Sequence, residues 1–107
     1  MPLIEHTSVE PVPMMPGVTR RTMTDGAHMM LCEVLLEAGA VVPEHTHPHE
    51  QTGYLASGRV SFRIGAETRE LAAGDAWMIP GGVPHEVTAL EASCAIDIFS
   101  PPRVEYR

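Results

Sequence analysis

The stretch Gly39-Ala-Val-Val-Pro-Glu-His-Thr-His-Pro-His-Glu-Gln-Thr-Gly-Tyr-Leu-Ala-Ser-Gly58 decides how this chain folds and what it binds. It places three histidines and Gln51 at alternate positions. Alternate residues of an extended strand point to the same face, so His45 and His47 are expected to reach one ion side by side. Gln51 has the same parity and adds an amide oxygen if the turn at Pro48 restores the register.

A second stretch, Gly74-Asp-Ala-Trp-Met-Ile-Pro-Gly-Gly-Val-Pro-His85, offers a further histidine at the edge of a strand. Imidazole nitrogens suit zinc, copper, iron and nickel, and an amide oxygen is a permissible neutral partner. The residues therefore predict one divalent metal ion with open coordination positions, without distinguishing nickel, zinc, iron or manganese. The predicted ligands are His45, His47, Gln51 and His85.

Both stretches have the residue spacing of the two cupin motifs. The first motif is matched by Gly39, His45, His47, Gln51 and Gly58, and the second by Gly74, Pro80, Gly82 and His85. Fifteen residues lie between Gly58 and Gly74, enough for a short hairpin. The chain thus resembles a single-domain cupin. It departs from the usual pattern at Gln51, where glutamate is common, and at Ala89, where many members have asparagine.

Length and composition agree with this resemblance. A chain of 107 residues is one domain with a modest core. Ten prolines and nine glycines interrupt it at short intervals, which favours many short strands and an all-β sandwich or barrel. The resemblance implies a cupin double-stranded β-helix, a jelly-roll-like barrel with the metal inside, towards the open mouth. The expected strands are 17–23, 28–37, 60–64, 68–71, 77–79, 85–90 and 92–100, besides those of the first motif.

The first sixteen residues are rich in proline, which removes backbone donors and blocks central strands. We expect residues 1–16 to form an extended arm and residues 17–107 to form the single cupin domain. In the strand that follows the arm, one of Arg20 and Arg21 faces inward, because alternation forces the choice. An inward arginine near the metal would bind a carboxylate.

The net charge of −7 argues against nucleic acid or an anionic membrane as partner. Cys32 and Cys94 lie far apart in apolar, strand-like stretches, which is typical of buried free thiols in a reducing compartment. The sequence has no signal peptide or apolar stretch long enough to span a membrane, so we expect a cytoplasmic protein.

From about Pro16 to Arg103 the chain is similar to the small cupins of pectin and alginate breakdown, which linearise unsaturated uronates. The similarity rests on Pro16-Gly-Val-Thr-Arg-Arg, His28-Met-Met, the segment from His45 to Gln51, Val83-Pro-His85 and Asp97-x-Phe-Ser-Pro-x-Arg103. It implies the four metal ligands above and site roles for Asp97, Phe99 and Arg103. It further implies a small anionic sugar, a 4,5-unsaturated monouronate, converted to linear 5-keto-4-deoxyuronate. Cupins of this size often form homodimers, which we expect here.

Two other classes of function stay open. One is a different metal-dependent cupin enzyme, such as a dioxygenase, isomerase or cyclase. Gln51 disfavours the iron oxygenases, because their common ligand sets include a carboxylate. The other class is a small-molecule-binding cupin without turnover. Asp97 on an apolar strand favours catalysis, and an exposed Asp97 remote from the metal ligands would favour binding.

Overall fold

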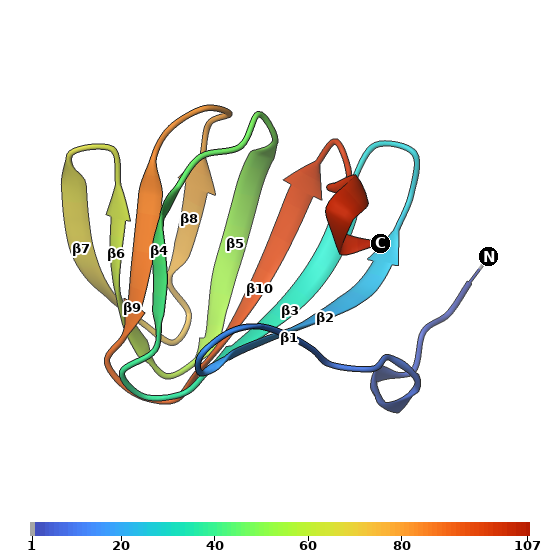
Figure 1. Cartoon of the computed structure of the whole chain (residues 1–107), viewed down its shortest axis with the longest axis horizontal. Helices are drawn as coiled ribbons and strands as arrows, with labels where there is room; N and C mark the ends of the chain where they lie inside the picture. The colour runs from blue at the N-terminus through green and yellow to red at the C-terminus, as the bar shows by residue number, and fades with distance from the viewer. Residues whose placement is uncertain (1) are drawn as a thin grey trace.

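Ten antiparallel strands in two sheets form most of residues 2–107, the part of the chain that this computed structural model describes (Figure 1). One sheet has the order β1-β2-β3-β10-β5-β8, and the other has the order β4-β9-β6-β7. The strands are β1 (Val12–Met15), β2 (Val18–Asp25), β3 (Met30–Leu36), β4 (Val41–His45), β5 (Glu50–Ser57), β6 (Arg59–Ile64), β7 (Glu67–Ala72), β8 (Ala76–Ile79), β9 (His85–Ala89) and β10 (Ser93–Ser100). The predicted all-β fold is confirmed.

Within residues 2–107 the helical content is limited to two 3-10 turns, η1 (His6–Ser8) and η2 (Val104–Tyr106). No helix among the described residues is long and apolar enough to cross a membrane. Cys32 and Cys94 are both free thiols; Cys32 is buried as predicted, whereas Cys94 is only half-buried.

The core lies between the inner faces of the two sheets. Strand alternation places Leu55 of β5, Val60 of β6 and Ile79 of β8 inside, each almost completely buried. Phe62 and Trp77 come from opposite sheets and pack against each other with tilted rings, their centroids 4.8 Å apart. This contact joins the two sheets. Burial of these side chains supplies the main stabilisation of the barrel.

The first motif does not form one continuous strand. His45 ends β4 in the four-stranded sheet, whereas Gln51 lies at the start of β5 in the six-stranded sheet. The chain crosses from one sheet to the other through the intervening loop, which contains His47. The prediction that His45, His47 and Gln51 share one face of a strand is therefore wrong in its geometry. The side chains converge because the two sheets face each other.

The segment predicted as an extended arm contributes η1 and the edge strand β1, which pairs with β2. Pro13 lies in β1, where an edge strand tolerates a missing backbone donor. The other end of the chain folds back beside β2 and β3, as Figure 1 shows. The Thr22 hydroxyl donates a 2.6 Å hydrogen bond to the Tyr106 carbonyl, and Arg107 pairs with Asp25.

Candidate functional site

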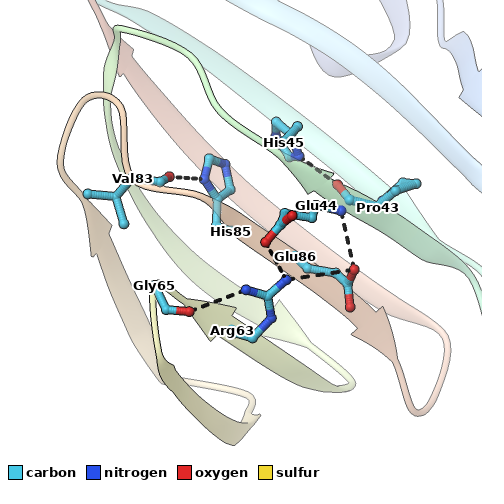
Figure 2. A network of polar contacts seen from close by, with 8 residues as sticks. All are labelled: Pro43, Glu44, His45, Arg63, Gly65, Val83, His85 and Glu86. Carbon is cyan, nitrogen blue, oxygen red and sulfur yellow. Dashed lines mark hydrogen bonds and ion pairs between the residues drawn. The ribbon is translucent and has the colours of Figure 1, made fainter.

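Three histidines from two neighbouring segments form the centre of the site. His45 of β4 and His85 of β9 are register partners, and their ring centroids lie 4.2 Å apart (Figure 2). His47, in the loop after β4, adds a third ring whose centroid is 5.0 Å from that of His85. One ligand atom from each of the three residues lies within 4.8 Å of the others. This spacing suits a single metal ion.

The hydrogen bonds of the three rings fix which nitrogen is available. Each Nδ1 lies at hydrogen-bond distance from a backbone carbonyl, so Nδ1 carries the proton and Nε2 keeps its lone pair. The Nε2 atom of His85 is buried and has no hydrogen-bond partner among the described residues. These residues therefore fit a divalent ion. The bonds run from His45 to the Pro43 carbonyl (2.8 Å), from His47 to the His49 carbonyl (3.1 Å) and from His85 to the Val83 carbonyl (2.9 Å).

Gln51 completes the set from the opposite sheet. Its side-chain N–H donates to Asp97 Oδ1 at 2.9 Å, which turns the amide oxygen toward the histidines. That oxygen lies 3.0 Å from His47 Nε2. With the His47 proton on Nδ1, two lone-pair atoms face each other, as ligands of a shared cation do. All four predicted metal ligands are thus brought together.

Burial keeps two of the histidines, His47 and His85, neutral. Burial, with smaller contributions from the charges of Arg103 and His85, lowers the pKa of His47 from 6.5 to about 4. Burial likewise lowers the pKa of His85. Both rings are therefore in the neutral form that binds metal at neutral pH.

Close contacts between the two motifs hold His47 in place. The Gly82 N–H donates to the His47 carbonyl at 2.8 Å. A Cβ at Gly81 would overlap the carbonyl oxygen of Pro48, so glycine is needed for the two loops to approach. The Pro-Gly-Gly segment of the second motif thus positions His47, a predicted ligand from the first motif.

An ionic network on the outer side joins the strands that carry His45 and His85 (Figure 2). The guanidinium of Arg63 lies 3.0 Å from a Glu44 carboxylate oxygen and 4.0 Å from one of Glu86. The Glu86 carboxylate also accepts a hydrogen bond from the Glu44 backbone N–H at 3.2 Å. These contacts link β4, β6 and β9 next to the histidines, although their partly exposed position makes each one weak.

Asp97 lies inside the barrel with 7% of its surface exposed. It is the register partner of Gly53 on β5, and its Oδ1 accepts hydrogen bonds from Gln51 and from the Trp77 indole, each 2.9 Å long. Burial raises the pKa of this carboxyl group, while the two hydrogen bonds and the positive charge of Arg103 oppose the shift. Its hydrogen bond with Gln51 places the carboxyl group next to the predicted metal ligands rather than remote from them.

The cavity beside the metal ligands also contains Phe99 and Arg103. Phe99 is the register partner of Gln51, and its ring meets His47 edge-on at a centroid distance of 5.7 Å. The Arg103 guanidinium lies 5.2 Å from the centre of the Phe99 ring and 4.1 Å from that of Tyr106. Six of the seven predicted site residues thus line one cavity, and the seventh, His47, lies against it through its contacts with Gln51 and Phe99.

The open choice between Arg20 and Arg21 is now decided. Arg20 points inward, is 9% exposed and stacks on Tyr106 at 4.0 Å. Arg21 pairs with Glu33 at 3.2 Å. Tyr106 was missed because no pattern marks a residue beyond the last strand.

Two other residues beside the ligands differ in their contributions. His49 supports His47 through its backbone carbonyl. Glu50 is exposed and makes no side-chain hydrogen bond among the described residues.

Trp77 was predicted only as part of a strand, although its indole contacts Asp97 directly. The one signal for Trp77 is that the chain contains a single tryptophan, within the second motif.

Comparison with known proteins identifies the family. Residues 32–99 match the family described as Cupin domain. The pectin degradation protein KdgF of Dickeya dadantii (strain 3937) is 36% identical over 92 residues, which cover 84% of each chain. The solved structure of KdgF from Halomonas sp. is 30% identical, with a TM-score of 0.95 over 100% of this chain and 99% of that one.

An RmlC-like cupin from Shewanella frigidimarina has the same fold at 24% identity, with a TM-score of 0.92 over 96% of this chain and 93% of its own. The two motifs, the paired sheets and these matches lead to one conclusion: the chain belongs to the cupin family and is a relative of the KdgF proteins.

Proposed function

We propose that this chain is a metal-dependent enzyme that opens 4,5-unsaturated monouronates, released by pectin or alginate lyases, to linear 5-keto-4-deoxyuronate. The observation that carries the proposal is the convergence of Asp97, Phe99 and Arg103 on the cavity beside the histidine cluster. The relative from Dickeya dadantii is named a pectin degradation protein, which supports the same substrate class.

The proposed substrate is a cyclic enol ether with a carboxylate on its alkene. A proton adds to C4, water adds to C5, and the bond between C5 and the ring oxygen then breaks. The hydrate left at C1 loses water, so the net reaction is an isomerisation that needs no oxidant or reductant. The protein has to move a proton, hold the carboxylate and control water.

Asp97 is the proposed proton carrier. Its Oδ1 already accepts two N–H donors, which leaves the second carboxyl oxygen to hold a proton for the substrate. Burial raises the pKa of Asp97, so the acid form persists to higher pH than it does for an exposed aspartate. A positioned acid or base commonly contributes ~10²–10⁴ to a rate.

Arg103 is the proposed contact for the substrate carboxylate. Its Nε donates to Glu105 at 2.8 Å, which leaves both terminal nitrogens for a two-point contact with an anion. Phe99, buried beside it, provides an apolar surface for the sugar ring and excludes water from that side.

The residues that would hold the metal are His45, His47, Gln51 and His85. A divalent ion there would supply positive charge that favours an anionic sugar and polarises a bound oxygen. Imidazole and amide ligands carry no negative charge, so they would cancel none of that positive charge.

A binding cupin without turnover is the alternative. The burial of Asp97 and its contact with Gln51 support the enzyme, because a carboxylate in such a place is costly unless it has a role. Incubation with lyase-generated unsaturated monouronate tests the proposal. Alkene absorbance should disappear faster than in the non-enzymatic control and than with metal-stripped protein. Binding without faster decay would refute it.

The homodimer and the cytoplasmic location stay predictions. The outward face of the six-stranded sheet exposes about half of Tyr54 (50%) and Met78 (53%), apolar area that a second copy would cover. Light scattering of the purified protein would test the homodimer.

A further inference from the structure

One row of side chains runs across the inner face of the six-stranded sheet at the level of Asp97. In this row, Cys32 pairs with Asp97, Asp97 pairs with Gly53, and Gly53 pairs with Trp77. Gly53 separates Asp97 from Trp77, yet the indole N–H reaches Asp97 Oδ1 at 2.9 Å. The indole therefore extends over the glycine to the carboxylate two strands away.

Position 53 requires glycine because a side chain there would have no room, not because of its backbone conformation. It is not among the glycines with positive φ, so its backbone is open to any residue. A Cβ at this position would instead overlap the Nε1, Cε2 and Cζ2 atoms of Trp77. Phe62 stacks on the same ring from the opposite sheet at a centroid distance of 4.8 Å. The indole is held between these two neighbours with its N–H directed at Asp97.

We propose that Trp77 is a positioning residue that holds Asp97 and, through Asp97, the amide of Gln51, and that Gly53 provides the space this requires. Trp77 and Gln51 donate to the same oxygen, Oδ1, from two sides. Two donors at one oxygen fix the rotation of the carboxylate. The fixed carboxylate in turn holds the N–H of Gln51, so the amide oxygen points at the histidines.

This inference rests on the proposed function only in taking the predicted metal site as the site that Trp77 supports. Its test uses nickel ion alone, with metal-stripped protein and calorimetry. Trp77→Phe keeps an aromatic ring but removes the N–H, and we expect it to weaken Ni²⁺ binding by about tenfold, the lower end for a residue that orients a ligand. Asp97→Ala should also weaken binding. The double variant should bind no more weakly than Asp97→Ala, because Trp77 acts through Asp97.

Tryptophan fluorescence gives a second readout, because Trp77 is the only tryptophan. Asp97→Ala should shift its emission to longer wavelength as water reaches the indole N–H. Gly53→Ala should displace the indole, change the emission and weaken Ni²⁺ binding although Trp77 is present. Gly26→Ala is the matched control, since a Cβ there meets nothing within 4 Å. It should leave emission and binding unchanged.

The proposal is overturned if Trp77→Phe binds Ni²⁺ like the wild type, or if the two single effects multiply in the double variant. It is also overturned if Gly53→Ala matches Gly26→Ala in both readouts. Should Trp77→Phe fail to fold, Gly53→Ala decides. Neither readout uses a uronate, so an inactive wild type would refute the proposed function alone.

Discussion

Replacing Gln51 by glutamate would test why this site departs from the usual cupin ligand. The Gln51 side-chain nitrogen lies 2.9 Å from Asp97 Oδ1, so Gln51→Glu would place two carboxylates in contact. At an effective dielectric constant of 20, two unit charges at that distance repel by about 6 kcal/mol. Protonating one carboxyl group of ordinary pKa at pH 7 costs about 4 kcal/mol. The pair should therefore keep one proton at neutral pH.

The consequences for binding and for turnover differ. Glutamate offers a charged oxygen in place of a neutral one, so Gln51→Glu should still bind metal, and more tightly. The site loses one unit of positive charge, and the proton that Asp97 would pass to the substrate is instead shared between two carboxyl groups. Metal analysis should show full loading, while uronate decay, followed by alkene absorbance, should slow by ~10²-fold or more.

The exchange variant Gln51→Glu with Asp97→Asn is the control. It returns an amide donor and a carboxylate acceptor to the contact, with their positions swapped. Thermal unfolding of metal-free protein should show lower stability for Gln51→Glu at pH 8 and recovery in the exchange variant. Turnover should not recover, because the carboxyl group has moved. If Gln51→Glu matches the wild type in catalytic efficiency on the uronate, the reasoning on neutrality is wrong.

The remaining predictions concern single residues. Asp97→Asn should keep metal content and cut turnover by ~10²-fold or more, measured by uronate decay; an unchanged rate would make Asp97 structural. Arg103→Ala should mainly raise KM in the same assay, because it removes a carboxylate contact. Since the pKa of His47 falls from 6.5 to about 4 on folding, the unfolded chain alone binds a proton between these values. Metal-free protein should thus lose about 3 kcal/mol of stability as pH falls through this window, and His47→Gln should remove that loss in urea titrations.

The motif spacing predicted correctly that the four side chains of the proposed metal site converge, although the assumed geometry was wrong. His45 and Gln51 were expected on one strand face, but they lie on different sheets. The spacing still holds, because the loop around Pro48 has the length needed to cross between the sheets. The spacing of the motif residues in the sequence predicts that their side chains converge. The geometry of that convergence depends on how strands distant in the sequence pair.

The contributions of other residues depend on pairing that no local pattern reveals. Alternation along β10 predicted that Asp97 and Phe99 share a face, and the structure agrees. Alternation also required that one of Arg20 and Arg21 face inward. It could not select which one, because the strand is plausible with either arginine on the inner face. The contact of Trp77 with Asp97 requires that β5 lie between β8 and β10 and that Gly53 occupy the row between them.

The charges around the cavity give one reason for the neutral ligand set. Six of the seven arginines form ion pairs with carboxylates among the described residues, and Arg20 is the exception. It is nonetheless buried, stacked on Tyr106 beside Arg103. Burial of an unpaired cation is costly unless a ligand compensates it. Gln51 is uncharged and burial raises the pKa of Asp97, so little negative charge opposes these two arginines within a protein of net charge −7. The proposed anionic substrate would compensate these arginines, and a glutamate at position 51 would cancel part of the charge that attracts it.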